Sequence, residues 1–201
     1  MSKGGKIGLG IFIGVVVIIL IFVLSIKNMY NNFVRLDENV KQKWSQVQNV
    51  YQRRYDLIPN LVETVKGYAA HERQTFQAVT EARAKVGRVI NLKAENLTPE
   101  NLANFQQAQA GLSSALQRLM VVVERYPDLK ANENFIRLQD ELAGTENRIA
   151  VERKRFTEAV QLYNQTIRKF PEVVFASMFG FTKKAYFEAV QQAQKAPKVK
   201  F

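Results

Sequence analysis

The residues best suited to chemistry lie in the stretch Arg53–Glu72, which reads RRYDLIPNLVETVKGYAAHE. It contains His71, the only histidine of the chain, together with two arginines, an aspartate and two glutamates. Two carboxylates such as Asp56 and Glu63 can act as a general acid and a general base. A histidine titrates near neutral pH and can move protons or bind a metal ion. Both kinds of chemistry need further residues at defined spacings.

Those further residues are missing from the sequence patterns. His71 and Glu72 begin HERQT, which lacks the second histidine of the H-E-x-x-H zinc motif. A di-iron helical bundle uses two Glu-x-x-His pairs, whereas this chain has one histidine and no cysteine. The seven-residue spacing of Asp56 and Glu63 is typical of a polar stripe on a helix. We therefore predict that the protein is not an enzyme and uses no catalytic residue, cofactor or metal ion.

The same stretch fits a structural joint around Pro59. A proline inside a helix removes one backbone hydrogen bond and clashes with the preceding turn, at a cost of ~3 kcal/mol. Arginine offers several donors in a planar fork that suits carboxylates and freed carbonyls. We predict a polar clasp that fixes this kink and draws its partner from a later helix. Its members are Arg53, Arg54, Asp56, Glu63 and Glu146.

Long amphipathic helices would position these residues. Apolar side chains recur at steps of three and four from Val40 to Ile90 and pass Pro59 without losing phase. This pattern predicts one long helix with a kink at Pro59. A break at Pro59 into two antiparallel helices is the alternative.

Two more helices follow along the chain. Thr98 can cap the second helix with Pro99 at its first position, and Pro127 ends it. The third helix is capped by Asp128 or Asn132, carries a regular apolar repeat from Phe135 to Phe170, and is expected to end at Pro171. No strand-like alternation is visible. Because amphipathic helices must bury their apolar faces together, we predict an all-α antiparallel bundle over residues 28–170.

An uncharged apolar run, Ile7–Ile26, precedes the bundle. It is long enough to cross a bilayer as a helix, and no small-residue cleavage site typical of a secretory signal follows it. We predict a retained transmembrane anchor over residues 1–27 and a single-pass protein of the cell membrane. Lys3 and Lys6 before the run favour a bundle on the non-cytoplasmic side, and the opposite orientation stays open.

The tail, residues 171–201, is rich in apolar side chains around Gly180. A short helix is expected from Lys183, with Tyr186, Phe187 and Val190 on one side. The tail either closes the bundle or forms a surface for membrane or partner contact. The residues predicted for such contact are Phe175, Met178, Phe179 and Phe181.

The chain carries a net charge of +11, of which residues 1–27 contribute three lysines and no acids. A basic domain tethered at a membrane attracts anionic lipid headgroups. Nucleic acid is the other anionic partner of basic proteins. We predict no nucleic-acid binding, because basic and acidic residues alternate along the helices, as in ERKRFTEA.

Three blocks of the sequence read YNNFVRLDENVKQKWSQVQNVYQRRYDLIPNLVETVKGYAAHERQTFQAVTEARA, LMVVVERYPDLKANENFIRLQDELAGTENRIAVERKRFTEAVQLYNQTIRKFP and MFGFTKKAYFEAVQQAQKAPKVKF. Together they resemble the LemA family. The resemblance covers nearly all of the chain from Tyr30 onward. It implies a bacterial membrane protein with one amino-terminal transmembrane helix and an all-helical domain. It supplies no catalytic residues.

Two function classes remain after these exclusions. The first is a membrane-anchored scaffold that associates with itself as a homo-oligomer and recruits protein partners whose identity the sequence does not give. The second is a binding or sensor module that responds to lipids or an anionic ligand at the membrane surface.

Overall fold

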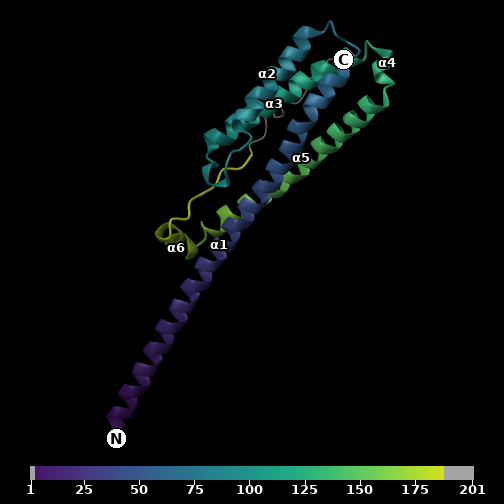
Figure 1. The fold of residues 1–201 in the computed structure, drawn as a ribbon. Helices are drawn as coiled ribbons and strands as arrows, with labels where there is room; N and C mark the ends of the chain where they lie inside the picture. Colours follow the sequence, from purple (N-terminus) through teal and green to yellow (C-terminus); the bar gives the residue numbers. More distant parts are fainter. Residues whose placement is uncertain (1–2, 188–201) are drawn as a thin grey trace, which may run out of the picture. The chain divides into compact units, whose positions relative to one another are not determined.

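The structure is a computed structural model that describes residues 3–187, with side chains from Phe12 onward (Figure 1). The described residues form helices and contain no strand, which confirms the predicted all-α class. The elements in chain order are α1 (Lys3–Lys66), α2 (Arg73–Val89), the 3₁₀ helix η1 (Ala94–Asn96), α3 (Pro99–Val123), α4 (Pro127–Lys130), α5 (Glu133–Thr166) and α6 (Glu172–Met178).

The helix α1 continues through Pro59 and ends at Lys66, so the alternative of a break at Pro59 is wrong. The predicted continuation to Ile90 is also wrong, because a turn over residues 67–72 separates α1 from α2. Glycine at position 67 disfavours further helix. Ala69, within the turn, is buried in the same core as the helices on both sides. The apolar periodicity therefore continues across the turn and does not indicate that the helix ends there.

Local side-chain chemistry sets the starts of α3 and α5. Thr98 Oγ1 accepts a hydrogen bond from the Asn101 N–H at 3.2 Å, and Pro99 is the first residue of α3, as predicted. Asn132 Oδ1 accepts from the Phe135 N–H at 3.0 Å, so Asn132 rather than Asp128 caps α5.

The end of α5 differs from the prediction, since the helix stops at Thr166. Arg168 and Lys169 donate their N–H groups three residues back, to Gln165 and Thr166, as the chain leaves the helix. Pro171 has no N–H to bond the carbonyl of Ile167, which disfavours another regular turn. The effect of Pro171 thus begins before the proline itself.

The chain divides into two compact units, and α1 and α5 contribute to both. Unit 1 contains α1 up to Asn39 together with Gln161–Lys183. Unit 2 contains Val40–Val160 together with the described residues from Lys184 onward. In unit 2, α2 and α3 lie side by side (Figure 1).

An aromatic cluster lies in the core of unit 2. The ring of Trp44 is 5.5 Å from Phe105, 5.3 Å from Phe156 and 6.1 Å from Phe187, measured between ring centroids. The Trp44 indole donates from Nε1 to the carbonyl of Leu92 at 2.6 Å. Phe187 belongs to a segment without regular secondary structure, residues 181–187, so the short helix expected from Lys183 is wrong over this range. Val190 lies outside the described residues.

Unit 1 contains the apolar part of α1. The helix is long and apolar enough to cross a membrane, and no side chain in its most apolar window is buried. Further along α1, Phe33 and Leu36 are buried. The Phe33 ring lies 5.3 Å from that of Phe181, and the Tyr163 hydroxyl donates to the Thr182 carbonyl at 3.0 Å. The segment after α6 therefore packs on α1 and α5 within this unit.

Candidate functional site

A buried arginine is the centre of the polar interior of unit 2. The side chain of Arg54, on α1, is 2% exposed. Its Nη1 lies 2.8 Å from Glu146 Oε2 on α5 and 3.2 Å from Ser113 Oγ on α3. Its Nη2 donates to Gln109 Oε1 on α3. One guanidinium group thus connects three helices, and a buried charge of this kind requires such partners.

The other members of the predicted clasp do not join Arg54. Arg53 Nη2 lies 3.8 Å from Glu141 Oε2, with both side chains about half exposed. Asp56 accepts a hydrogen bond from Gln52, and Glu63 pairs with Lys66 one turn away on the same helix. The structure therefore brings together Arg54 and Glu146. Arg53 forms a separate, exposed pair with Glu141 on α5, and Asp56 and Glu63 have exposed contacts within α1. The role of the cluster in fixing α1 near Pro59 stays a prediction.

Sequence reasoning missed Gln109 and Ser113. Gln109 is buried and falls in phase with the apolar residues Leu102, Phe105 and Leu112 of α3. A glutamine at an apolar position of a helical repeat indicates a buried polar contact, because an unpaired amide in a core is costly. That signal was present in the sequence without naming Arg54 as the partner.

The chemistry open to this cluster is structural. Arginine stays protonated in proteins and cannot serve as a base. Burial raises the pKa of the neighbouring Tyr51 hydroxyl, although the nearby cations Arg153 and Arg54 partly oppose the shift. With its pKa raised, the Tyr51 hydroxyl keeps its proton near pH 7.

His71 is exposed in the turn after α1, and Glu72 beside it pairs with Arg125 at 2.9 Å. Within the part of the chain that the structure describes, no group of three potential metal-ligating side chains comes together.

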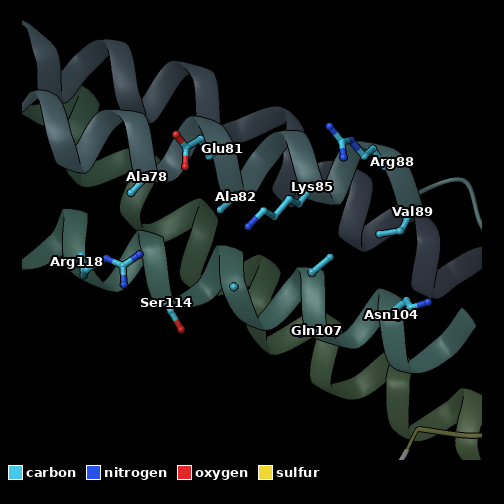
Figure 2. A pocket seen from close by; sticks show the side chains of 12 residues that line it. Ala78, Glu81, Ala82, Lys85, Arg88, Val89, Asn104, Gln107, Ser114 and Arg118 are labelled. Atoms are coloured by element: carbon cyan, nitrogen blue, oxygen red, sulfur yellow. The ribbon is translucent and has the colours of Figure 1, made fainter. Parts of the chain in front are cut away.

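A groove of about 560 Å³ runs between α2 and α3 on the surface of unit 2 (Figure 2). Small residues line part of it, including Ala78, Ala82, Ala108 and Gly111. Figure 2 shows Lys85 extending from α2 over the space between the two helices. Lys85, Arg88 and Arg118 line the groove with one acidic residue, Glu81. Its chemistry suits an anionic group.

The four tail residues predicted for membrane or partner contact lie in unit 1. The Phe175 ring is 6.3 Å from Phe22, while Phe179 and Phe181 lie 5.2 Å and 5.9 Å from Tyr30. Met178 is 72% exposed. Three of the four thus contact α1, and the fourth faces outward.

The sequence profile of the LemA family matches residues 43–201, most of the chain. The chain belongs to the LemA family. This confirms the resemblance noted in the sequence, and the LemA-family chain is accordingly a membrane-associated helical protein of a kind found in bacteria.

Curated relatives cover most of this LemA-family chain. It is 30% identical over 183 residues to magnetosome protein MamQ 2 of Paramagnetospirillum magneticum, covering 83% of this chain and 67% of that protein. It is 29% identical over 182 residues to magnetosome protein MamQ of Magnetospirillum gryphiswaldense, with the same coverage. It is 23% identical over 178 residues to protein LemA of Metamycoplasma hominis, covering 85% of this chain and 77% of that protein. These names state no catalytic activity.

Proposed function

We propose that this LemA-family chain is a non-enzymatic, single-pass membrane protein that associates with itself to form a scaffold. The observation that carries the proposal is an exposed face on α5. Ile136, Ala143 and Ala150 recur there at seven-residue steps, and Val151 lies beside them. All four side chains are exposed, although the opposite face of α5 is already buried in the bundle. A second apolar stripe at heptad spacing is typical of a helix that packs against another helix.

The charges on this face favour an antiparallel pair of α5 helices from two copies. Asn147 lies at the middle of the face, and Asp140 and Lys154 lie seven residues to either side of it. A two-fold axis at Asn147 would bring Asp140 of one copy to Lys154 of the other. It would also place Ala143 opposite Val151. A parallel pair would instead bring Asp140 to Asp140, which is repulsive.

The pair would use the same surface of both copies, as closed two-fold dimers do. Lys154 already lies 3.9 Å from Glu158 in its own chain, and both side chains are exposed. Such a surface pair contributes little to stability, so Lys154 remains available to pair with a second carboxylate. Further contacts through the bundle would extend dimers into a scaffold at the membrane.

Cysteine cross-linking tests the pairing directly, because the chain has no native cysteine. Asn147→Cys should form a disulfide dimer in membranes under mild oxidation. Ala143→Cys should cross-link to Val151→Cys when both variants are mixed, and not to itself. The matched control is Ser114→Cys, an exposed and nearly isosteric change on α3, which should stay monomeric on a denaturing gel.

The outcomes separate the two arrangements. Self-cross-linking of Ala143→Cys would indicate a parallel pair and refute the antiparallel arrangement. Absence of every cross-link, together with a monomer mass for the full chain in mild detergent, would refute self-association itself.

A second candidate function rests on the groove between α2 and α3. Its cations Lys85, Arg88 and Arg118 would bind an anionic ligand or lipid headgroup, as expected of a sensor module at the membrane. The groove variant Arg88→Gln/Arg118→Gln should then lose salt-sensitive binding to vesicles that contain phosphatidylglycerol. The control Arg53→Gln/Arg148→Gln removes two cations from a different surface hollow of about 490 Å³. Equal loss in both variants would indicate a general charge effect and no specific site.

A further inference from the structure

The short helix α6 has an outward face that is mostly apolar. Its sequence is EVVFASM, and its only charged residue, Glu172, is half-buried, with Oε2 shielded from solvent. Ala176 is buried. Val174 is 53% exposed and Met178 is 72% exposed, and they lie one turn apart on the same side. Phe170, two residues before α6 begins, is 85% exposed. Exposed apolar side chains gathered in this way mark a contact surface.

Contacts with α1 fix the depth of α6 relative to the apolar run. Phe175 contacts Phe22, which lies four residues, or about 6 Å along the helix axis, inside the end of the run at Ile26. Phe179 and Phe181 contact Tyr30, about 6 Å beyond that end. A tyrosine is common at the level of lipid headgroups. Amphipathic helices at membrane surfaces bury their apolar faces about 5–10 Å into the headgroup and acyl boundary. The helix α6 lies at that level.

The charges beside α6 have the sign that a bilayer surface favours. Arg168 and Lys169 precede the helix, Lys183 follows it, and all three are exposed. Basic residues near a membrane are attracted to anionic headgroups, while the apolar side chains between them enter the acyl region.

We propose that α6 and Phe170 insert into the bilayer leaflet that holds the Ile26 end of the apolar run, with Phe170, Val174 and Met178 in contact with acyl chains. The chain therefore has a second membrane attachment about 150 residues after the first. The inference requires that α1 crosses the membrane. It does not depend on self-association, so a failure of the scaffold proposal would leave it standing.

The test uses the full chain in vesicles of phosphatidylcholine and phosphatidylglycerol. Single cysteines carrying the fluorophore NBD are placed at Val174 and Met178, and are quenched with phosphatidylcholine that bears a spin label on its acyl chain. Val15→Cys, within the span, is the positive control. Gln161→Cys is the matched control in unit 1, since its neighbour Tyr163 interacts with Asp37, about 16 Å beyond Ile26.

We expect quenching at Val174 and Met178 of at least about half that at Val15, and several-fold more than at Gln161. Quenching no greater than at Gln161 would overturn the proposal, with two readings. If the labels also react freely with a water-soluble quencher, α6 lies in water. If they are shielded from both quenchers, a protein surface covers α6. Absence of quenching at Val15 would remove the premise that α1 spans the bilayer and would overturn the proposal as well.

Discussion

Replacing Glu146 by alanine should leave Arg54 as a buried cation without the carboxylate that pairs with it. Breaking a fully buried ion pair costs ~3–5 kcal/mol, whereas breaking an exposed pair costs ~0.2–1 kcal/mol. Here Arg54 is 2% exposed and Glu146 is 57% exposed, so water screens one end of the pair. We expect Glu146→Ala to lower the free energy of unfolding by about 1–2 kcal/mol, between these limits.

Replacing Arg54 should lower the free energy of unfolding more than replacing its partner Glu146. Arg54→Ala removes a buried side-chain stem and leaves Gln109 Oε1 and Ser113 Oγ without their donor. We expect a loss of about 3–4 kcal/mol from the cavity and the unpaired polar atoms. In the double variant, Glu146 no longer has a charge to satisfy. Its removal should then cost nothing further, so the two effects should not add.

The assay is unfolding of the full chain by guanidinium chloride in mild detergent. Fluorescence of Trp44, the only tryptophan, reports on unit 2 because its ring is buried there. The matched control is Glu141→Ala, which breaks the neighbouring pair with Arg53 and should cost less than about 0.5 kcal/mol because that pair is exposed. Equal effects of Glu146→Ala and Glu141→Ala, or additive effects of Arg54→Ala and Glu146→Ala, would refute this reasoning.

Three further predictions concern single side chains. Gly111→Ala should raise the free energy of unfolding by up to about 1 kcal/mol, because the new methyl group meets open space on a helix. Gly87→Ala should bring no gain in stability, because its methyl group would lie 3.1 Å from the Tyr55 hydroxyl. Unfolding followed by Trp44 fluorescence compares the two variants. Burial, with a smaller contribution from Asp37, raises the pKa of Tyr163 from 10.0 to about 12. The contribution of this tyrosine to the free energy of unfolding is therefore complete below pH 10 and is lost as the pH rises from 10 to 12. Tyr163→Phe should abolish an ultraviolet absorbance transition near pH 12, and persistence of that transition would assign it to another tyrosine. Thr98→Ala should lower stability by ~1 kcal/mol through loss of the α3 cap, while Thr98→Ser should retain most of it, as thermal unfolding followed by circular dichroism would show.

The helices and their starts could be predicted because the forces that form them are local. Apolar residues at three- and four-residue steps define α1, α3 and α5, and an oxygen-bearing side chain such as Thr98 or Asn132 marks a start. The turn over residues 67–72 was not predicted, because Ala69 is buried in the same core and keeps the apolar periodicity intact. The helix α6 was not predicted, because β-branched Val173 and Val174 have a low helix propensity and packing on α1 decides the conformation of this segment.

The candidate sites depend on how distant helices meet, which a single sequence does not show. Arg54 and Glu146 are 92 positions apart, and the sequence suggested a partner on a later helix without fixing how the two helices align. Arg53 and Asp56 carry equally suitable groups, yet the rotation of α1 turns them to the surface. Exposed apolar residues on α5 and α6 were visible in the sequence only as apolar residues, because exposure is a property of the folded chain.

The make-up of unit 1 also constrains how the protein is made. Its first part ends at Asn39 and its second begins at Gln161, so the whole of Val40–Val160 is synthesised between them. At about 5–20 residues per second, the first part waits on the order of 6–24 s for the segment that carries Phe181, whose ring packs on Phe33. During that interval the Phe33 side chain lacks this native contact. A nascent chain stalled before residue 161 should therefore be a preferred substrate for chaperones that bind apolar helices.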